Sequence, residues 1–534
     1  AQIFYPQLEK YNLGILCQEL GISLEQAHSA LSDAQATAEL FLCMRQKMFG
    51  LPKGLLERLL SLSDSLLYES YLVIEEVYQK QSLLVEHDLV EVQGLFLRKE
   101  KPVLSPRKLS KDFQTNIALL GLEERSQQEE FAQKVQEFLQ GEAISFIQAQ
   151  TGIGKTYGYL LPALSLENEG GILLSVPTKI LQNQVIQEEA KRLEEIFHIS
   201  IQSLKGPQNY LKLDAFHTVL EEEESNRLYT RFKMQLLVWL TETDTGDLDE
   251  IGQLYRYQQF LPNLVHDGNL HKDSLFWLED FWKRGQDKAR SCKLLVTRLE
   301  DDPSLLEGRL LILDEAQKIL LTLENLSRKT YLLTDLLDQL DQALSREEGM
   351  LQRRLLESIR FEVSYLLDQF LSGKRKMCPA SSIDKLHQDF SELNLPEFKD
   401  YQRFFTSEGE FWLSTSDVSS KKVEITSSRN HRLLFSQIFP ESCQLLGISA
   451  TLEISSRVSL PELLGFPQAA FYCMDEQFQE NQEILLVKDF PLVTEISSEE
   501  YAQAIVEVLE ELFQFEEPIL VLFRCFEGSP SGPV

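Results

Sequence analysis

Residues 143–166 of the chain, AISFIQAQTGIGKTYGYLLPALSL, predict its fold. The apolar run at the start indicates a short buried strand, a glycine-containing turn follows directly, and YGYLLPALSL has the composition of a helix. A strand, a turn and a helix in this order open an α/β domain. Three further apolar runs, at 170–178, 309–315 and 443–451, are typical of parallel strands that are buried on both faces.

The separations between these runs predict two insertions. The turn at 149–156 lies much farther from 309–315, and that run much farther from 443–451, than one crossover helix requires. Both intervening segments are rich in Leu, Gln and Glu with helical spacing. We therefore expect an α/β fold, a parallel sheet with two mostly helical insertions at 205–292 and 326–435.

The turn has the chemistry of a phosphate-binding loop. Its sequence AQTGIGKT matches a P-loop with alanine in place of the first glycine. Glycines let backbone N–H groups wrap the phosphates, Lys155 supplies a positive charge and the Thr156 hydroxyl can bind Mg²⁺. A chance glycine-rich turn is the alternative, but the flanking strand and helix favour a site for ATP and Mg²⁺. The expected ATP-binding residues of the loop are Ala149, Gln150, Thr151, Gly152, Ile153, Gly154, Lys155 and Thr156.

A second motif lies at 310–317, LLILDEAQ. A carboxylate at the end of a buried strand can hold the Mg²⁺ shell, and an adjacent carboxylate can orient the attacking water. We assign Asp314 to the metal and Glu315 to the water, as the catalytic pair. By itself the segment could be a strand that runs into an acidic helix cap, and the P-loop upstream favours nucleotide hydrolysis instead.

Three shorter motifs complete the pattern. Residues 175–179 read SVPTK, residues 449–451 read SAT, and Arg125 and Gln128 are three positions apart in ERSQQ. In this order the motifs resemble superfamily 2 helicases, in particular the DinG/XPD-like group. An unrelated P-loop kinase or transport ATPase would explain neither the P-T-K and S-A-T segments nor the paired insertions.

The resemblance implies a RecA-like P-loop NTPase sheet and a role for each motif. The P-T-K segment would contact the DNA backbone, the S-A-T segment would couple ATP hydrolysis to strand movement, and the R-x-x-Q pair would recognise adenine. The residues concerned are Pro177, Thr178 and Lys179 for DNA, Ser449, Ala450, Thr451 and Gln317 for coupling, and Arg125 and Gln128 for adenine.

One departure from this group concerns an iron–sulfur cluster. Many members hold a four-cysteine cluster in the first insertion, starting in a K-G-x-x-N-Y-L-C segment. The matching stretch here, 205–212, ends in Lys212, and only Cys292 lies between it and Asp314. One thiolate cannot hold a cluster that takes four. We therefore predict no iron–sulfur cluster, which leaves open whether the protein separates strands as its relatives do.

Two further departures concern ATP turnover. The group usually has His where this chain has Gln317, and Gln can hydrogen-bond across a cleft but cannot carry a proton. No segment after Phe523 resembles the arginines that a second RecA-like domain donates to the transferred phosphate, which are worth about 10³ to 10⁵ in rate. We expect this chain to bind ATP better than it hydrolyses it.

Residues 5–45 resemble the end of DnaQ-like 3′-5′ exonucleases, whose domain is RNase H-like. The last motif of that family, H-x-x-x-x-D, matches at His28 and Asp33. There the His abstracts a proton from water, and the Asp joins other carboxylates around divalent metal ions, Mg²⁺ or Mn²⁺. A capping or surface histidine is the alternative, and the helicase motifs downstream favour an exonuclease–helicase fusion. The other carboxylates would precede residue 1, so we expect an incomplete nuclease centre.

These resemblances divide the chain. The expected divisions are an exonuclease remnant at 1–48, a helical and β-hairpin connector with a linker at 49–111, a RecA-like ATP-binding domain at 112–204, 293–325 and 436–455, a first insertion at 205–292, a helical arch-like second insertion at 326–435, and the start of an incomplete second RecA-like domain at 456–534.

Composition limits the class of protein. The formal net charge of −31 argues against a protein that coats nucleic acid, although it is compatible with a local basic groove. Basic clusters at 98–111, 374–376 and 421–432 could line such a groove or could be solvated loops. The seven scattered cysteines are typical of a reducing cytoplasm, where we expect the protein to reside. No apolar run approaches the ~18 residues of a membrane span, so no membrane partner is expected.

Two functional hypotheses remain. The first is an ATP-dependent DNA helicase or translocase with a 3′-5′ exonuclease domain, acting in repair or replication on DNA that is single-stranded or has a single-stranded tail. The second is an ATP-binding regulatory module that gates DNA binding or the attached nuclease without unwinding. The sequence does not determine the oligomeric state.

Overall fold

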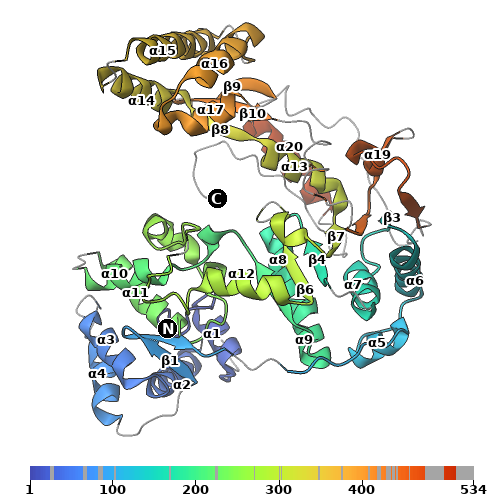
Figure 1. Ribbon diagram of the computed structural model, residues 1–534. Coiled ribbons are helices and arrows are strands. Elements are labelled where there is room, and N and C mark those ends of the chain that lie inside the picture. Colours follow the sequence, from blue (N-terminus) through green and yellow to red (C-terminus); the bar gives the residue numbers. More distant parts are fainter. Residues whose placement is uncertain are drawn as a thin grey trace. The chain divides into compact units, whose positions relative to one another are not determined.

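Figure 1 shows the protein as a computed structural model. The structure describes residues 1–474 and 498–512, apart from 25–28, 64–65, 67–68, 82–87, 101–103, 167–169, 223–225, 270, 300, 302, 347–348, 374–376, 407–408, 418–421, 429–434, 436–438, 440–442 and 456–457. The chain forms two compact units, 1–474 and 475–534, and each is described by itself.

A parallel sheet lies at the centre of the first unit. Its strands are β3 (Ile144–Gln148), β4 (Ile172–Ser175), β5 (Ile201–Leu204), β6 (Leu294–Thr297), β7 (Leu310–Asp314), β11 (Leu445–Ser449) and β14 (Ala470–Cys473). Their order is β14-β3-β11-β7-β4-β6-β5, and each neighbouring pair is parallel. β4, β6 and β11 are buried along their whole length, as expected of strands covered on both faces. The predicted α/β parallel sheet is therefore confirmed.

Alternate residues of the strands face two different cores. Phe146 and Leu173 belong to one cluster of buried side chains, and Ile147 and Leu174 belong to another. This alternation follows because successive side chains of a strand point to opposite faces of the sheet. Helices on the second face are α5 (Phe113–Leu119), α6 (Ser126–Gly141), α7 (Lys155–Ser165), α8 (Lys179–Val185) and α9 (Lys191–Phe197). Two apolar layers thus enclose the sheet.

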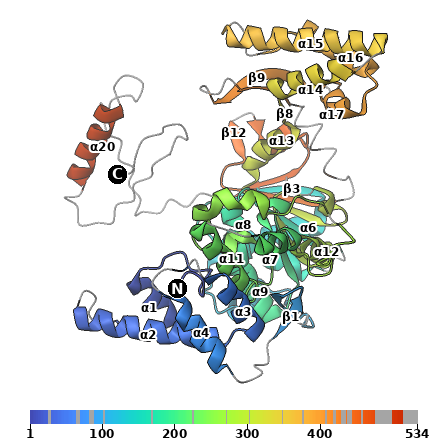
Figure 2. The ribbon, with the colours of Figure 1, turned by 90° about the vertical axis from the view of Figure 1, so that its left-hand side faces the viewer.

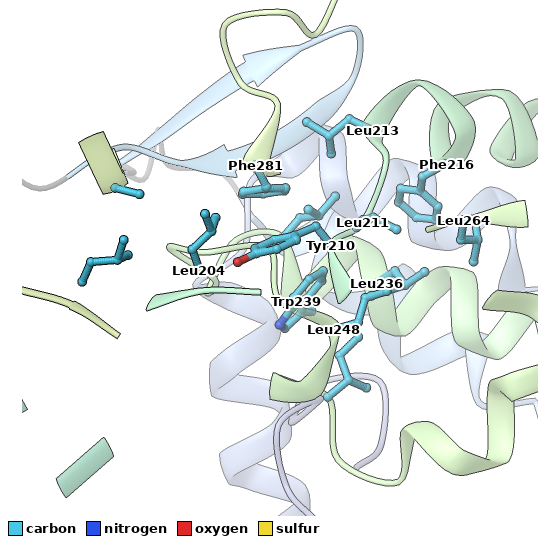
Figure 3. Close-up of a cluster of buried hydrophobic side chains, with 14 of the residues drawn as sticks. Leu204, Tyr210, Leu211, Leu213, Phe216, Leu236, Trp239, Leu248, Leu264 and Phe281 are labelled. Atoms are coloured by element: carbon cyan, nitrogen blue, oxygen red, sulfur yellow. The ribbon is translucent and has the colours of Figure 1, made fainter. Parts of the chain in front are cut away.

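The first insertion supplies the layer on the other face. It consists of α10 (Leu213–Glu221), α11 (Arg227–Trp239), α12 (Phe281–Ser291) and 3₁₀ turns at Leu248–Glu250 and Leu254–Asn263. Figure 3 shows Trp239 and Tyr210 side by side among leucines of the insertion, with Phe216 and Phe281 at the edges of the cluster. The same cluster includes Leu173 of β4, so the insertion and the sheet share one core.

The N-terminal region packs on the first insertion. Its elements are α1 (Leu13–Leu20), α2 (Ala30–Phe49), α3 (Lys53–Ser61), α4 (Tyr71–Lys80), β1 (Leu89–Val92) and β2 (Leu95–Arg98). The N–H of Gly252 donates to the carbonyl of Pro6 at 2.9 Å, and Lys47 pairs with Glu242 at 2.6 Å. A Cβ at Gly252 would overlap the Leu8 carbonyl, so glycine permits this close approach. Regions that are far apart in the sequence therefore form one folded body.

The predicted hairpin in the connector is confirmed. β1 and β2 pair antiparallel, with Val92 opposite Leu95. The two residues between them, Gln93 and Gly94, both have positive φ, at 50° and 75°. This is the backbone conformation that a tight two-residue hairpin requires.

The second insertion contains helices and a small sheet. α13 (Ile319–Ser327) leads into it from the sheet and contributes Ile319 and Leu323 to the core that the sheet shares with the first insertion. The helices of the second insertion are α14 (Leu333–Arg346), α15 (Met350–Leu371), α16 (Ala380–Glu392) and α17 (Lys399–Phe405), and its strands are β8 (Lys329–Leu332), β9 (Glu410–Asp417) and β10 (Lys422–Ser428). β10 pairs antiparallel with both β8 and β9. The helices were predicted, whereas the three-stranded sheet was not. Its strand β8 pairs with β10 across about ninety residues of intervening chain, which no local pattern indicates, although β9 and β10 are neighbours in the sequence.

The end of the first unit differs from the expected boundary at residue 455. β12 (Glu453–Ser455), β13 (Val458–Ser459) and α19 (Leu460–Leu464) are followed by β14, which pairs with β3 so that Phe471 lies opposite Phe146. The first unit therefore continues to Met474. In the second unit, the structure describes one helix, α20 (Ser498–Leu512; Figure 2). The expected start of a second RecA-like domain otherwise lies largely outside the described residues.

Candidate functional site

The loop between β3 and α7 has the backbone of a phosphate-binding turn. Gly152 and Gly154 have φ of 86° and 82°, in the left-handed region that glycine adopts without strain. The side-chain amide of Gln128 donates to the carbonyl of Gly154 at 2.8 Å. A Cβ at Gly154 would overlap this amide, so both the torsion and the space require glycine there.

The backbone N–H groups of this loop are available to donate hydrogen bonds to a bound anion. Within the part of the chain that the structure describes, no group accepts a hydrogen bond from the backbone N–H of residues 150–154. These N–H groups precede the N-terminus of α7, where the helix dipole favours an anion. The loop therefore fits the phosphates of a nucleotide.

Lys155 connects the loop to the second motif. Its ammonium group donates to the carbonyl of Ala149 at 3.3 Å and lies 3.9 Å from Oε1 of Glu315. The Lys155 side chain is 11% exposed. Its charge therefore lies where a bound phosphate can displace the remaining water. Ala149 is itself held by its N–H, which donates to the Ser449 carbonyl at 2.9 Å.

Asp314 is placed at the carboxyl end of β7 and is held on both of its oxygens. The Tyr159 hydroxyl donates to Oδ2 at 3.2 Å, and the N–H of Glu315 donates to Oδ1 at 3.0 Å. Burial raises the pKa of Asp314, and the neighbouring Glu315 carboxylate raises it further. The Tyr159 hydrogen bond and the Lys155 charge oppose that rise in pKa. A buried carboxylate of this kind gains stability from a divalent cation nearby.

The residues expected to couple hydrolysis to movement form a chain of hydrogen bonds across the end of the sheet. Gln317 donates to Oε2 of Glu315 at 2.8 Å and accepts a hydrogen bond from the Ser449 hydroxyl. That hydroxyl also accepts from the N–H of Thr451 at 3.0 Å. Ala450 lies between the two residues of this turn, and Glu315 has a positive φ of 49°. Two motifs separated by more than a hundred residues thus meet in one network.

Arg125 and Gln128 both contact the loop backbone. Arg125 donates to the Gly152 carbonyl at 3.4 Å and is exposed, whereas Gln128 is buried against Gly154. These contacts account for the two residues as supports of the loop. Their expected role in recognising adenine stays a prediction.

Two residues of this site were not foreseen from the sequence. Tyr159 is fully buried, and burial together with the Asp314 charge raises its pKa well above the ordinary value. Burial raises the pKa of Glu189, and the charges of Glu188 and Asp314 raise it further. Neither residue belongs to a short motif, and only the position of Tyr159 one helical turn after Lys155 could have indicated it.

The P-T-K segment lies at the start of α8. Thr178 caps the helix by accepting from the N–H of Leu181 at 3.3 Å, and Pro177 is partly exposed beside it. The Lys179 ammonium donates to the side-chain oxygen of Asn209. The candidate DNA-contact residue is therefore tied to the start of the first insertion.

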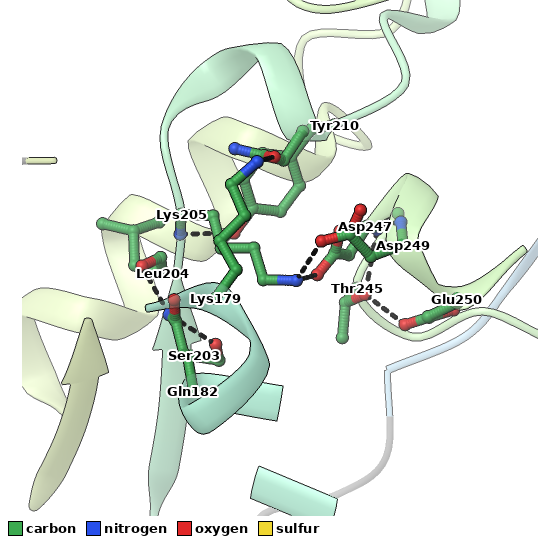
Figure 4. Close-up of polar contacts among 12 residues, drawn as sticks. Lys179, Gln182, Ser203, Leu204, Lys205, Tyr210, Thr245, Asp247, Asp249 and Glu250 are labelled. Carbon is green, nitrogen blue, oxygen red and sulfur yellow. Dashed lines mark hydrogen bonds and ion pairs between the residues drawn. The ribbon is translucent and has the colours of Figure 1, made fainter. Parts of the chain in front are cut away.

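A buried ion cluster lies next to this contact. Lys205, 1% exposed at the end of β5, is 2.5 Å from Oδ2 of Asp247 and 2.8 Å from Oδ2 of Asp249 (Figure 4). Burial lowers the pKa of Lys205, but the two carboxylates raise it by more, so the net direction is upward. The cluster connects the sheet to the 3₁₀ turn of the insertion.

The residues at the expected iron–sulfur position do not fit such a cluster. Lys212 is engaged with Asp267 at 2.9 Å, and the Cys292 thiol donates to the Ala289 carbonyl at 3.4 Å at the end of α12. Among the described residues, no group of three or more His, Cys, Asp or Glu side chains could hold a metal ion. The prediction that this chain lacks the cluster remains untested.

The structure describes only one of the two residues that match the exonuclease motif. Asp33 lies in the first turn of α2 and is partly buried, and its carbonyl accepts from the Thr37 hydroxyl at 2.7 Å. His28 lies outside the described residues. The pairing of these two residues, and any metal held by Asp33, stay predictions. The basic cluster at 374–376 also lies outside the described residues.

Comparison with known proteins agrees with the helicase motifs. Residues 126–238 match the DEAD/DEAH box helicase family. A protein named 3′-5′ exonuclease DinG from Staphylococcus saprophyticus is 32% identical over 283 residues, and its namesake from Staphylococcus aureus is 31% identical over 278 residues. Each match covers 49% of this chain and 31% of the relative, so the chain spans about a third of the length of these curated relatives. The resemblance predicted from the motifs is confirmed.

Solved structures named Truncated XPD and XPD_Helicase are similar to this chain at 14% identity, each with a TM-score of 0.38. The first match covers 65% of this chain and 100% of that structure, and the second covers 66% and 62%. None of the described helices is both long enough and apolar enough to span a membrane.

Proposed function

From the DEAD/DEAH box helicase domain that this chain contains, we propose that it is the ATP-binding part of a DinG-type DNA helicase or translocase that is coupled to a 3′-5′ exonuclease. Its substrate is DNA that is single-stranded or has a single-stranded tail. The cellular role that we propose is DNA repair or replication.

One observation supports this function most directly. The loop of 149–156, the acidic pair Asp314 and Glu315, and Ser449 converge at the carboxyl ends of adjacent parallel strands. In open α/β sheets this edge is where ligands bind. A phosphate loop beside an acidic strand end is the arrangement that phosphoryl transfer to water requires.

The proposed roles follow from the contacts. The free N–H groups of 150–154 and the Lys155 ammonium bind the phosphates, and Thr156 and Asp314 hold Mg²⁺. When bound, Mg²⁺ neutralises charge that develops on the phosphates. Glu315, held by the Gln317 amide, orients the attacking water. Because Gln317 also bonds to Ser449, a change at the phosphates is transmitted to the S-A-T turn.

The test is nucleotide binding and ATP hydrolysis by this chain, with and without single-stranded DNA. We expect Lys155→Ala to abolish binding and any turnover, since it removes the only cation beside Glu315 that the described residues place in the loop. Lys399→Ala, an exposed lysine of α17, is the matched control and should leave both unchanged. Turnover that DNA stimulates and that Lys155→Ala abolishes supports the motor. Absence of nucleotide binding in the unaltered chain contradicts it.

A second function is favoured by Gln317. This residue cannot carry a proton and is already bonded on both sides, to Glu315 and Ser449. A protein that changes conformation when nucleotide binds, without rapid turnover, needs only such a hydrogen-bonded connection between the two motifs. In that case ATP gates DNA binding or the attached nuclease. ATP-dependent DNA affinity without hydrolysis selects this function over the motor.

A further inference from the structure

A buried amide of the first insertion holds the ammonium group of Lys179. The acceptor is Oδ1 of Asn209, which ends the 3₁₀ turn Pro207–Asn209 shortly after β5. Asn209 is 6% exposed, whereas Lys179 is partly exposed at the start of α8. The contact therefore joins a lysine that solvent can reach to a side chain that is fixed in the interior.

The orientation of the Asn209 amide is set by its other contacts. Its Nδ2 donates to the Gly206 carbonyl at 2.7 Å, and its backbone N–H donates to the same carbonyl at 3.0 Å. An ammonium group has no lone pair, so only the amide oxygen can serve Lys179, and the amide nitrogen must face an acceptor such as the Gly206 carbonyl. Asn209 thus offers its oxygen to Lys179 in one orientation.

The turn that carries Asn209 is held by more distant parts of the insertion. The N–H of Lys205 donates to the Tyr210 hydroxyl at 3.0 Å, and the N–H of His266 donates to the Tyr210 carbonyl at 2.9 Å. The Lys205 ammonium pairs with Asp247 at 2.5 Å. Because these partners come from separate segments, the fold of the whole insertion determines where Asn209 lies.

The helix that carries Lys179 is held by the sheet. The side-chain amide of Gln182 in α8 donates to the Ser203 hydroxyl at 3.0 Å and to the Leu204 carbonyl at 2.9 Å, both in β5 (Figure 4). It also donates to the Val296 carbonyl of β6 at 3.0 Å. Both partners of the contact between Lys179 and Asn209 are therefore placed by the same end of the sheet.

Lys179 keeps its positive charge. In the described part of the chain no carboxylate forms an ion pair with it, and Asp247 and Asp249 pair instead with Lys205 (Figure 4). A neutral amide oxygen accepts one N–H and leaves two N–H groups of the ammonium for another partner. Lys179 follows β4, whose carboxyl end lies beside that of β7 with Asp314. In a chain with a net charge of −31, such a cation at the ligand-binding edge of the sheet is suited to a phosphate.

We propose that Asn209 is a positioning residue for DNA: it orders the Lys179 ammonium at the carboxyl edge of the sheet, where the two remaining N–H groups bind a phosphate of the single-stranded backbone. This inference rests on the proposed function. A lysine side chain that is already ordered loses less conformational freedom on binding, so Asn209 raises the affinity without contacting DNA. The first insertion thereby takes part in DNA binding through amide and ion-pair contacts.

The experiment measures the fluorescence anisotropy of a fluorescein-labelled single-stranded oligo(dT), titrated with the protein at several KCl concentrations. We expect Asn209→Ala to weaken binding roughly two- to tenfold, the range that corresponds to ordering one long side chain. The slope of log affinity against log salt should stay the same, because the lysine still reaches the phosphate. Lys179→Ala should make that slope shallower by about 0.7, the value of one phosphate contact on a single strand.

The double variant separates positioning from a general structural role. In the Lys179→Ala background, Asn209→Ala should have no further effect, because no ammonium group is left to position. An equal loss of affinity in both backgrounds overturns the inference, since it would reflect a loosened insertion. An Asn209→Ala protein with unchanged or increased affinity also overturns it, as does a Lys179→Ala protein that binds like the unaltered one.

Asn226→Ala is the matched control. This exposed asparagine of the same insertion caps α11 by accepting from the N–H of Leu228 at 3.0 Å. Its loss should lower the melting temperature and leave the affinity for oligo(dT) unchanged. Thermal unfolding of every variant checks that it is folded.

Asn209→Asp is a second variant that tests the same contact if Asn209→Ala does not fold. It keeps the size of the side chain and gives Lys179 a charged partner that competes with phosphate, so the salt slope should become shallower by about 0.7. An unchanged slope overturns the inference. If the unaltered protein binds no oligo(dT), the DNA-binding part of the proposed function fails as well, which distinguishes that outcome from the failure of the inference alone.

Discussion

The two insertions are anchored in different ways. The first shares one buried cluster with the sheet and the N-terminal region, in which Trp239, Leu173 and Leu56 all take part. The second has a cluster of its own, with Phe390 and Phe405 stacked at a centroid distance of 5.0 Å. Since packed side chains transmit strain, a disturbance in the first insertion should reach the proposed ATP site, whereas the second can unfold as a separate cooperative unit.

The largest expected effect comes from truncating one large buried side chain in each of the two cores. Trp239 is fully buried, and its indole N–H donates to Glu250 at 3.2 Å. Trp239→Ala should cost about 3 to 5 kcal/mol of unfolding free energy. Hydrogen exchange should then show loss of protection in α3 as well as in α11, because the two helices share this core.

Phe390→Ala is the counterpart in the second insertion. It should cost about the same, roughly 3 to 5 kcal/mol, yet lower protection only within α14 to α17 and β8 to β10. Nucleotide affinity should remain that of the unaltered protein. The two insertions are not anchored differently if Phe390→Ala lowers protection in β3 or β7, or if Trp239→Ala leaves α3 protected.

The next effect concerns the ion cluster at the base of the first insertion. Lys205→Met keeps the apolar stem of the side chain but leaves Asp247 and Asp249 without their cation. Removing one partner from a buried pair costs about 3 kcal/mol or more. Urea unfolding should record this loss, and Arg353→Ala, from the exposed Arg353–Glu357 pair of α15, should cost under about 0.5 kcal/mol. Equal effects of the two substitutions would show that the cluster does not anchor the insertion.

The smallest effect is a pH dependence at Lys212. The Lys212 ammonium, 2.9 Å away, and the Asn269 N–H hold the pKa of Asp267 below its ordinary value. A carboxylate with a lowered folded-state pKa contributes stability above its unfolded-state pKa of about 4 and loses it as pH falls further. Asp267 is half exposed, so Lys212→Ala should cost at most about 1 kcal/mol at pH 7.

Unfolding measured at several pH values checks this. The difference between Lys212→Ala and the unaltered protein should shrink as the pH falls below about 4, where the unfolded carboxyl becomes protonated. A difference that stays constant down to pH 2 would mean that Lys212 stabilises the insertion through its stem and not through the ion pair.

Short motifs allowed the residues of the candidate phosphate site, and their positions at strand ends, to be predicted from the sequence. Loop residues 149–156 and the acidic pair at 314–315 are contiguous in sequence, and each sits at the end of an apolar run. The local rules of strand, glycine turn and helix therefore suffice to place them. The two long stretches of sequence between the predicted strands are likewise longer than one crossover helix. Because the chain returns to the same sheet after each of them, each had to contain an insertion.

Tyr159, Glu189 and the shared core could be identified only from the tertiary structure. Glu189 lies in a π-helical turn between α8 and α9, and no short pattern of residues predicts such a turn. The strand β14 joins the sheet through backbone pairing with β3, and backbone hydrogen bonds carry little information about which side chains take part. Contacts between distant segments depend on how complementary surfaces meet, and this information is not local to any stretch of the chain.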